Sequence, residues 1–211
     1  MVEIAPPPPK ILPIEPALSS IDKGECLARI FDPTTRHNTN ALNFRHHSPL
    51  ERFDHQQYSR NAPSTDEKRG IYYAGFTLSC CLVEVFGDKR TIEVGNYCVA
   101  SVQLKRPLSL LDLCGTPAMT NGTVYALSGV PERDLSQDWS RYFYDNYNIY
   151  TKVDGIIYPN AHNGDLSLAL YERAKDALSC SPSDVMPLNH KALRTDIRKV
   201  AQENGLIVVD Y

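Results

Sequence analysis

The chain has 211 residues, a mass of 23.7 kDa, 42% hydrophobic and 22% charged residues, and a formal net charge of −3. This apolar content is enough for one hydrophobic core and excludes a disordered chain. No apolar run approaches the ~20 residues of a spanning helix, and the mildly acidic balance argues against a protein that mainly binds phosphate backbones. The start, MVEIAPPPPK, lacks the pattern of a secretory signal. We therefore expect a soluble, cytoplasmic protein with no membrane partner and no direct nucleic-acid binding.

The six cysteines predict free thiols. They show no CxxC spacing, and several lie within apolar runs such as TLSCCLVEVF. Disulfide frameworks belong mainly to small secreted proteins, and adjacent Cys80 and Cys81 diverge on any regular element. No HExxH pattern supports a metal enzyme. We expect buried thiols and no bound metal.

A proline-rich arm is predicted to precede one folded domain. Six prolines fall within the first 20 residues, which is typical of an extended segment. We therefore assign residues 1–20 to the arm and residues 21–211 to the domain. Strands are predicted over residues 25–31, 70–76, 97–104, 108–113, 153–159 and 206–210. Helices are predicted over residues 78–87, 117–127, 136–146 and 191–204. This irregular alternation favours the α+β class over a doubly wound parallel sheet.

The helix predicted over residues 78–87 carries a single carboxylate, Glu84. Thr77 or Ser79 is expected to cap its first turn. Its apolar residues keep helical spacing and are expected to face the core: Leu78, Cys81, Leu82, Val85 and Phe86. Glu84 falls near the edge of this apolar stripe. Upstream, residues 33–69 form a long polar stretch without a period, and such stretches are often functional.

One set of residues in this chain suits the binding and cleavage of a dinucleotide. Its members are Arg45, Arg52, Tyr72, Tyr73, Glu84 and the segment Tyr158-Pro159-Asn160. An arginine fork pairs with pyrophosphate, an aromatic ring stacks on cationic nicotinamide, and a glutamate stabilises an oxocarbenium-like transition state. Taken singly, however, each residue is explained better by a structural role than by a functional one. Arg52 fits a surface ion pair, Tyr73 a core aromatic and Glu84 a solvated helix residue. The phosphate-loop and hydrolase patterns GxxxxGK[ST], GxGxxG and GxSxG are absent.

The order and spacing of several motifs resemble the RES domain family, which is named for its arginine, glutamate and serine. Arg52-Phe53-Asp54 resembles the family's GRW/F-N/D element, and Tyr73-Ala74 resembles its hYxA strand. Glu84 stands eleven residues beyond Tyr73, as the family's glutamate does. The segment VDGIIYPNAHNGDLSLALYERA is similar to the family's DGhhYPS segment. Together the matches run from about Cys26 to the C-terminus and leave out the proline-rich arm.

The resemblance implies a fold similar to that of ADP-ribosyltransferases such as diphtheria toxin, with a central split β-sheet and flanking helices. It also implies a toxin of a type II toxin–antitoxin pair with an Xre-like antitoxin as partner. NAD would be the substrate, with no further cofactor, and its nicotinamide–ribose bond would be cleaved with water as acceptor. A second hypothesis keeps the same site but transfers ADP-ribose to a protein side chain.

The resemblance also implies roles for individual residues. Arg52 would bind the NAD phosphates, Tyr73 would contact the nicotinamide ribose end, and Glu84 would be the catalytic carboxylate. Arg29 matches a recurrent family arginine and is a second phosphate-binding candidate. Its alternative role is that of a strand residue paired at the sheet edge.

Asn160 stands where the family has a serine after Tyr-Pro. An amide still donates and accepts hydrogen bonds, so Asn160 is expected to contact the substrate. Ser167 and Ser179 lie nearby in sequence but do not fit the motif. The replacement leaves open a third hypothesis, a catalytically weak module that binds nucleotide or antitoxin. A fourth, a Cys–His enzyme built on Cys80 or Cys81, has no histidine that the sequence places in reach.

Overall fold

A computed structural model describes residues 3–35, 37, 39–47, 49–57 and 65–209. Its main feature is a nine-stranded sheet in the order β1-β6-β7-β8-β3-β2-β5-β10, with β9 paired to β5. The strands are β1 (Leu18–Ile21), β2 (Cys26–Phe31), β3 (Ile71–Gly75), β5 (Cys98–Leu104), β6 (Leu108–Asp112), β7 (Gly155–Pro159), β8 (Leu166–Tyr171), β9 (Leu178–Ser179) and β10 (Val185–Pro187). A second sheet pairs β11 (Ile207–Val209) with β4 (Thr91–Glu93) in parallel.

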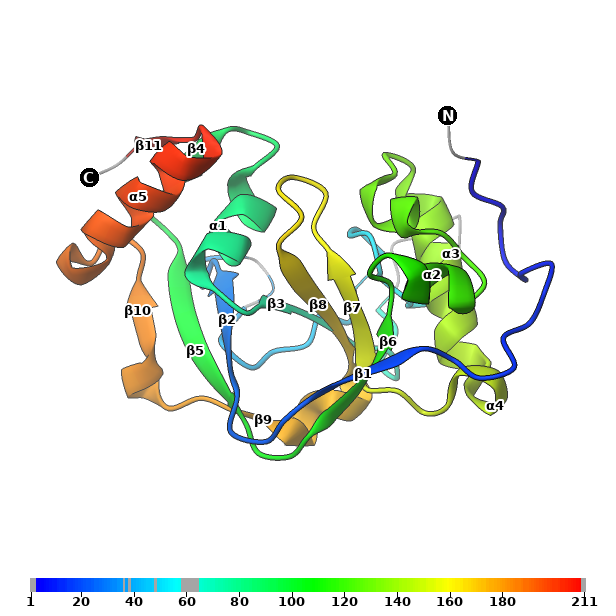
Figure 1. Ribbon diagram of the computed structural model, residues 1–211. Coiled ribbons are helices and arrows are strands. Elements are labelled where there is room, and N and C mark those ends of the chain that lie inside the picture. Colours follow the sequence, from blue (N-terminus) through cyan, green and yellow to red (C-terminus); the bar gives the residue numbers. More distant parts are fainter. Residues whose placement is uncertain (1–2, 36, 38, 48, 58–64, 210–211) are drawn as a thin grey trace.

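The helices form two groups at opposite ends of the main sheet (Figure 1). One group holds α1 (Leu78–Phe86) and α5 (Arg194–Asn204), beside β2, β5 and β10. The other holds α2 (Thr116–Thr120), α3 (Arg133–Asp145) and α4 (Tyr147–Tyr150), beside β6 and β7. This mixed architecture, a large central sheet with flanking helices, confirms the predicted α+β class.

The main sheet is nearly divided between β2 and β3. These two strands share one register pair, Ala28 with Gly75. In contrast, β2 pairs along its whole length with β5, and β3 pairs along its whole length with β8. The sheet is therefore split, as expected, and α1 begins directly beyond the split, three residues after β3 ends at Gly75.

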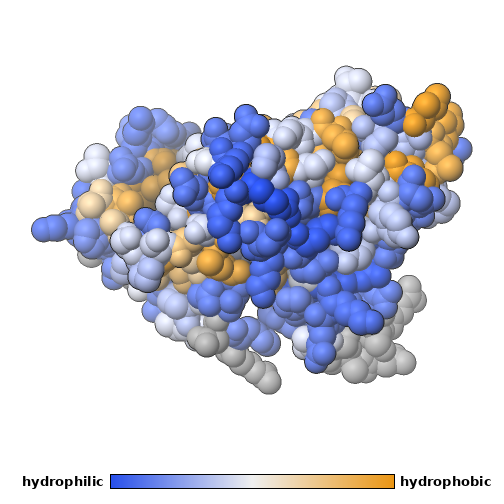
Figure 2. All heavy atoms as spheres, turned by 90° about the horizontal axis from the view of Figure 1, so that it is seen from below, coloured by the Kyte–Doolittle hydropathy of each residue, from blue (hydrophilic) through white to orange (hydrophobic). Residues whose placement is uncertain are grey.

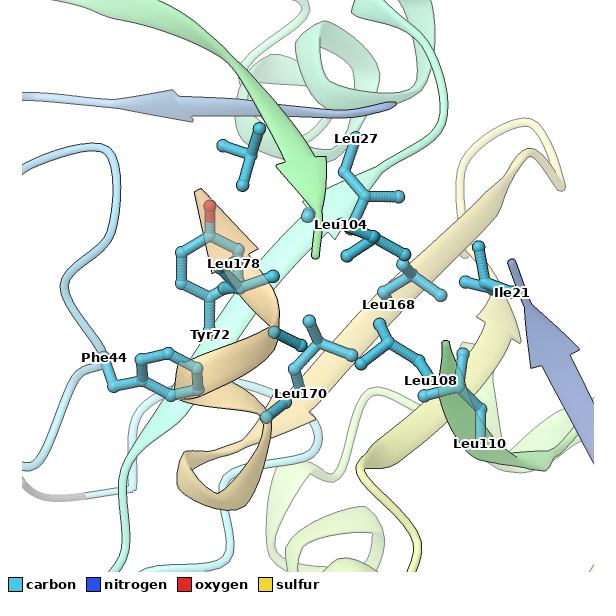
Figure 3. Close-up of a cluster of buried hydrophobic side chains, with 14 of the residues drawn as sticks. Ile21, Leu27, Phe44, Tyr72, Leu104, Leu108, Leu110, Leu168, Leu170 and Leu178 are labelled. Atoms are coloured by element: carbon cyan, nitrogen blue, oxygen red, sulfur yellow. The ribbon is translucent and has the colours of Figure 1, made fainter. Parts of the chain in front are cut away.

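The two faces of β3 serve different purposes because successive residues of a strand point to opposite sides. Tyr72 is fully buried, packs against Phe44 with ring centroids 5.1 Å apart, and donates a hydrogen bond to the Ala41 carbonyl (2.8 Å). Figure 3 shows the hydrophobic cluster to which it belongs, which includes Ile21, Leu27, Phe44, Tyr72, Leu104, Leu108, Leu110, Leu168, Leu170 and Leu178. Tyr72 is thus a core residue, while Tyr73 faces the other side.

The helix α1 begins as its sequence predicts. The Thr77 hydroxyl accepts a hydrogen bond from the backbone N–H of Cys80 (3.0 Å) and caps the first turn. Leu82 and Phe86 are buried, but Val85 is 41% exposed. The prediction that Val85 faces the core is wrong because that side of α1 borders an open cleft.

The helix predicted over residues 117–127 is also wrong as a single element. The chain forms α2, then turns through Gly122, whose φ of +85° favours glycine, and continues as a 3₁₀ turn over Tyr125–Gly129. The side chain of Asn121, next to this turn, accepts a hydrogen bond from the N–H of Ala17 (2.9 Å) and donates one to its carbonyl (3.0 Å). Asn121, at the end of α2, thus fixes the backbone of the residue that precedes β1.

The proline-rich arm lies along the second group of helices (Figure 1). The indole N–H of Trp139 on α3 donates to the carbonyl of Ala5 (2.9 Å). Residues 18–20, which the sequence assigns to the arm, form β1 together with Ile21. Several large apolar side chains of this region are exposed: Ile11, Leu12, Ile14 and Met119. Figure 2 shows hydrophobic residues gathered at the right-hand end of the molecule, the end where Figure 1 places the arm.

The structure also bears on the expectations about cysteines, metal sites and membrane-spanning helices. All six cysteines have free thiols, as predicted, but only Cys80 and Cys81 are buried, since Cys26 is exposed and Cys98, Cys114 and Cys180 are half-buried. Within the described ranges, no cluster of three or more His, Cys, Asp or Glu side chains could hold a metal ion. In the same part of the chain, every helix is too short or too polar to cross a membrane.

We expect Gly155→Ala to destabilise the fold. A Cβ atom at Gly155 on β7 would meet the Ala169 backbone oxygen and lie 2.7 Å from the Leu170 Cα. Because backbone atoms cannot rotate away, we expect the free energy of unfolding to fall by about 1–3 kcal/mol in urea denaturation. Gly129→Ala is the control, since nothing lies within 4 Å of a Cβ there. Equal effects of the two substitutions would contradict this reading.

Candidate functional site

A cleft of about 470 Å³ opens at the split between β2 and β3. Its walls come from both halves of the sheet, from α1 and from the polar stretch before β3. They include Arg29, Arg52, Tyr73, Gly75, Cys80, Glu84, Tyr158, His162 and Ser167. Four of the five predicted site residues, Arg29, Arg52, Tyr73 and Glu84, therefore meet in one place although they are far apart in sequence.

Glu84 projects from the exposed edge of α1 into this cleft. Its side chain is open to solvent, yet the surrounding protein atoms desolvate the carboxyl and raise its pKa. Hydrogen bonding by Ser167 and Tyr158 and the charges of His162 and Arg52 oppose this increase. The carboxyl group thus sits among donors and cations, which suits a group that carries negative charge during a reaction.

Arg52 reaches the cleft from a segment without a helix or strand. Its guanidinium donates a hydrogen bond to the carbonyl of Val130, and Phe53 next to it is fully buried. The backbone N–H of Phe53 donates to the Tyr73 hydroxyl (3.0 Å). Arg52 is therefore held on both sides, by its own side chain and by the residue that follows it.

The buried carboxylate of Asp54 fixes the rest of this segment. Asp54 has no solvent exposure and accepts four hydrogen bonds from the described residues. Two come from the N–H groups of Leu50 (2.6 Å) and Glu51 (2.9 Å). The others come from the guanidinium of Arg45 (2.7 Å) and the hydroxyl of Tyr73 (2.9 Å). Since a buried charge must be paired and hydrogen-bonded, Asp54 determines where residues 50–54 lie.

One face of α3 forms hydrogen bonds with the same segment, residues 50–53. Arg133, Gln137 and Ser140 are spaced so that they share a face of the helix. They donate to the carbonyls of residues 50, 51 and 53 over 2.6, 2.9 and 2.7 Å, respectively. Arg133 also forms an ion pair with Glu51 (2.9 Å) at the rim of the cleft. The position of Arg52 thus depends on a helix about 80 residues further along the chain.

The ring of Tyr73 lines the cleft, while its hydroxyl is hydrogen-bonded within the protein. The hydroxyl accepts from the N–H of Phe53 and donates to Asp54. Burial, followed by the negative charge of Asp54, raises the pKa of Tyr73 well above its ordinary value. Tyr73 can therefore offer a substrate an aromatic surface, and its hydroxyl serves to hold the segment that carries Arg52.

Arg29 on β2 is a buried cation at the edge of the cleft. Its side chain lies over the ring of Tyr72, with the guanidinium carbon 4.0 Å from the ring centroid. It is 9% exposed, and its Nη1 atom has no hydrogen-bond partner among the described residues. Burial lowers the pKa of Arg29 because desolvation disfavours the charged form. A buried cation with an unsatisfied donor is suited to an anionic ligand.

Asn160 is placed differently from the expectation, since it belongs to the loop after β7 and does not line the cleft. It is 4% exposed, and its side-chain oxygen accepts from the N–H groups of His162 (3.0 Å) and Asn163 (2.9 Å). Its amide N–H groups donate to the Asn163 side chain (2.8 Å) and to the sulfur of Cys80 (4.0 Å), a residue that lines the cleft. The polar atoms of Asn160 thus fix the turn of the loop and join it to α1.

The thiols of Cys80 and Cys81 are poor nucleophiles in this structure. The Cys80 sulfur lies 3.2 Å from both the Ser167 hydroxyl and the Leu166 carbonyl, and the Cys81 sulfur donates to the Ala28 carbonyl (3.1 Å). Burial raises the pKa of both thiols. A raised pKa disfavours the thiolate, which a Cys–His enzyme requires.

Sequence reasoning missed several residues that shape this site. The motifs contain Asp54 only as the third residue of Arg52-Phe53-Asp54, and no motif marks the polar face of α3. Ser167 does not fit the Tyr-Pro motif, although a serine in the otherwise apolar strand LSLALY is an available signal. A polar residue in a buried strand needs a partner, and here that partner is in the cleft.

The resemblance to the RES domain family implies an α+β fold with a split sheet, and the structure has such a sheet, with arginine, tyrosine and glutamate side chains lining the cleft at the split. The RES domain family matches residues 27–192. The chain therefore belongs to the RES domain family, which confirms the resemblance.

One solved structure has a similar fold. It is a chain of the crystal structure of the M. tuberculosis MbcT–MbcA toxin–antitoxin complex, with a TM-score of 0.53 and 14% sequence identity. The likeness covers 85% of this chain and 92% of that chain. No curated protein sequence matches this chain.

We expect Asp54→Ala to lower the free energy of unfolding by about 3–5 kcal/mol, because Arg45, Tyr73 and two backbone N–H groups lose their acceptor. Chemical denaturation followed by tyrosine and tryptophan fluorescence measures this loss. Asp138→Ala is the matched control, since it breaks a surface ion pair with Arg141 and should change stability by less than about 1 kcal/mol. A small effect at Asp54 would show that the segment is held by other contacts.

Proposed function

We propose that this chain is the toxin of a toxin–antitoxin pair and that it cleaves NAD between nicotinamide and ribose. One observation carries the proposal: Arg29, Arg52, Tyr73 and Glu84, from four separate segments, line a single cleft. The volume of about 470 Å³ is in the usual range of small-molecule sites. Membership of the RES domain family and the likeness in fold to a toxin–antitoxin structure support the toxin assignment.

In the proposed reaction, the bond between ribose C1′ and the nicotinamide nitrogen breaks, and its electron pair leaves with neutral nicotinamide. A water oxygen bonds to C1′ and releases one proton, which gives free ADP-ribose. The Glu84 carboxylate stabilises the positive charge that develops at C1′. No general acid is required, because nicotinamide leaves as a neutral base.

The other residues bind and orient the dinucleotide. The unsatisfied Nη1 donor of Arg29 and the guanidinium of Arg52 suit the pyrophosphate, which accepts hydrogen bonds at several oxygens. The ring of Tyr73 offers a surface for the cationic nicotinamide. NAD is the substrate here, and the chemistry uses no further cofactor.

A partner follows from this chemistry. An enzyme that consumes NAD must be silenced in its own cell, so we expect an Xre-like antitoxin to bind this chain and a cytoplasmic location for the pair.

The test is to incubate the purified chain with NAD and to follow nicotinamide and ADP-ribose by chromatography. We expect equal amounts of both products and a fall in kcat of about 10²–10³-fold in Glu84→Gln, because a carboxylate aimed at developing charge is lost. Arg52→Ala should be weakened as well. Glu203→Gln on the exposed side of α5 is the control and should match the wild type.

Other products would point elsewhere. Nicotinamide release only when other protein is added, together with a mass increase on that protein, would favour ADP-ribose transfer. Binding of NAD without turnover would favour a binding module, and absence of binding would contradict the proposal.

The unsatisfied donor of Arg29 leads to a paired prediction. We expect Arg29→Met to stabilise the ligand-free protein, because replacing a poorly paired buried charge with an apolar side chain removes a desolvation cost. The same change should weaken ADP-ribose binding about tenfold or more. Thermal unfolding with and without ADP-ribose measures both effects. A variant that is less stable and binds equally well would show that Arg29 is a structural residue.

A further inference from the structure

We propose that His55 is a positioning residue for Arg52, and that only its neutral imidazole holds the segment that carries this arginine. His55 stands three residues after Arg52 and directly after the buried Asp54. Its effect on a dinucleotide rests on the proposed function, but its effect on the segment does not. Uptake of a proton by the imidazole would then displace the segment and weaken the binding of phosphates in the cleft.

The imidazole of His55 is enclosed by the protein. It has no solvent exposure, and its ring centroid lies 4.5 Å from those of both Tyr144 on α3 and Tyr171 on β8. Its Nε2 atom lies 3.1 Å from a carboxylate oxygen of Glu172, which directly follows β8. A carboxylate only accepts hydrogen bonds, so the neutral imidazole carries its proton on Nε2 and donates a hydrogen bond to Glu172.

The acceptor, Glu172, is itself fixed by other parts of the chain. Its carboxylate accepts hydrogen bonds from the hydroxyl of Tyr144 (2.6 Å) and from the N–H of Gly70 (3.2 Å). Burial raises the pKa of Glu172, but hydrogen bonds from His55 and Tyr144 lower it and prevail. The carboxylate thus stays charged and anchors His55 to α3 and to the residue before β3.

The other ring nitrogen, Nδ1, makes this contact sensitive to pH. It is buried and has no hydrogen-bond partner within the described ranges. A proton on Nδ1 would add a positive charge and a donor that no acceptor satisfies, which the protein interior disfavours. Two cations, Arg69 and Arg173, already lie over the ring of Tyr144, with guanidinium carbons 4.8 and 4.1 Å from its centroid. The charged imidazole therefore has to move towards water.

The charged and titratable groups around His55 determine the direction of the effect. They are Glu172 and Arg173 after β8, Tyr171 on β8, Tyr144 on α3, Arg69 before β3, and Asp54 in the same segment. Burial is the largest influence and lowers the pKa of His55, against the hydrogen bond and the charge of Glu172. A displaced histidine has an ordinary pKa of ~6.5. The held arrangement is therefore fully stable above pH ~6.5 and loses stability as the pH falls from there towards the lowered pKa.

Displacement of His55 moves Arg52 because the segment between them has no helix or strand. His55 is covalently joined to Asp54, which accepts hydrogen bonds from the N–H groups of Leu50 (2.6 Å) and Glu51 (2.9 Å). Arg52 lies in the chain between these N–H groups and Asp54. A shift of the imidazole therefore disturbs both hydrogen bonds, and the two N–H groups report on the position of Arg52.

The first measurement needs no ligand. The imidazole nitrogens of His55 are observed by ¹H–¹⁵N correlation NMR, with His55→Gln to assign the signals. We expect the Nε2–H tautomer at neutral pH and a titration midpoint below ~6.5. Glu172→Gln should lower the midpoint further, because the charge that favours a protonated imidazole is lost. An Nδ1–H tautomer, or a midpoint above ~6.5, would overturn the inference.

The second measurement is hydrogen exchange of the Leu50 and Glu51 N–H groups on lowering the pH through this range. We expect their protection in the wild type to fall by up to about tenfold per pH unit below ~6.5, because each displaced chain takes up one proton. His55→Gln should lack this fall, since its amide still donates to Glu172 and does not titrate. If that variant folds poorly, Glu172→Gln serves instead, and its fall should extend to lower pH.

The third measurement is ADP-ribose binding by titration calorimetry at about one pH unit above and one below ~6.5. We expect the ratio of the two affinities to be at least about threefold larger in the wild type than in His55→Gln, because only chains with a held segment bind well. His190→Gln is the matched control and should behave like the wild type, since His190 is exposed. Glu84 is unchanged in all three proteins, so the comparison removes the contribution of its titration.

The outcomes separate this inference from the proposed function. Protection that does not change with pH in the wild type, or that falls equally in His55→Gln, would overturn the inference. A fall that requires His55, in a chain that binds no ADP-ribose at any pH, would support the role of His55 in the segment and contradict the proposed function. Equal affinity ratios in the wild type and His55→Gln, in a chain that does bind ADP-ribose, would show that His55 does not position Arg52 and overturn the inference.

Discussion

The structure depends on the buried carboxylate of Asp54. A segment with no helix or strand carries Arg52, and such a segment has no backbone ladder to define its position. Asp54 fixes the position of the segment instead. Its desolvated carboxylate accepts hydrogen bonds from two backbone N–H groups, Arg45 and Tyr73. A charge without solvent tolerates few alternative arrangements. The polar face of α3 also holds this segment, because its side chains donate hydrogen bonds to three of the segment's carbonyls.

The split in the sheet is the second constraint. Because β2 and β3 meet at one pair, the sheet leaves an opening where a continuous ladder would leave none. The opening joins the end of β3 and the first turns of α1 in one cleft, which Arg29 also lines. Arg29 is buried there with a side-chain nitrogen, Nη1, that has no hydrogen-bond partner within the described ranges.

A single strand, β3, links stability and function. Tyr72 points into the main core and binds the Ala41 carbonyl, while Tyr73 points to the cleft and binds the Asp54 segment. The same alternation on β8 places Leu168 and Leu170 in the core and Ser167 in the cleft. The same two strands therefore build both the core and the floor of the cleft.

The sequence by itself determined the α+β class, five of the nine strands of the main sheet and the start of α1, because periodicity and capping are local properties. It left the cap open between Thr77 and Ser79, and it indicated Arg29, Arg52, Tyr73 and Glu84 as site residues only through the order and spacing of the family's motifs. The tertiary structure alone decided which residues share a space. Asn160 carries the motif position yet turns into its own loop, and Ser167 occupies the cleft floor through pairing with β3 and β7. Register and burial depend on contacts between distant segments, and no local pattern in the chain contains them.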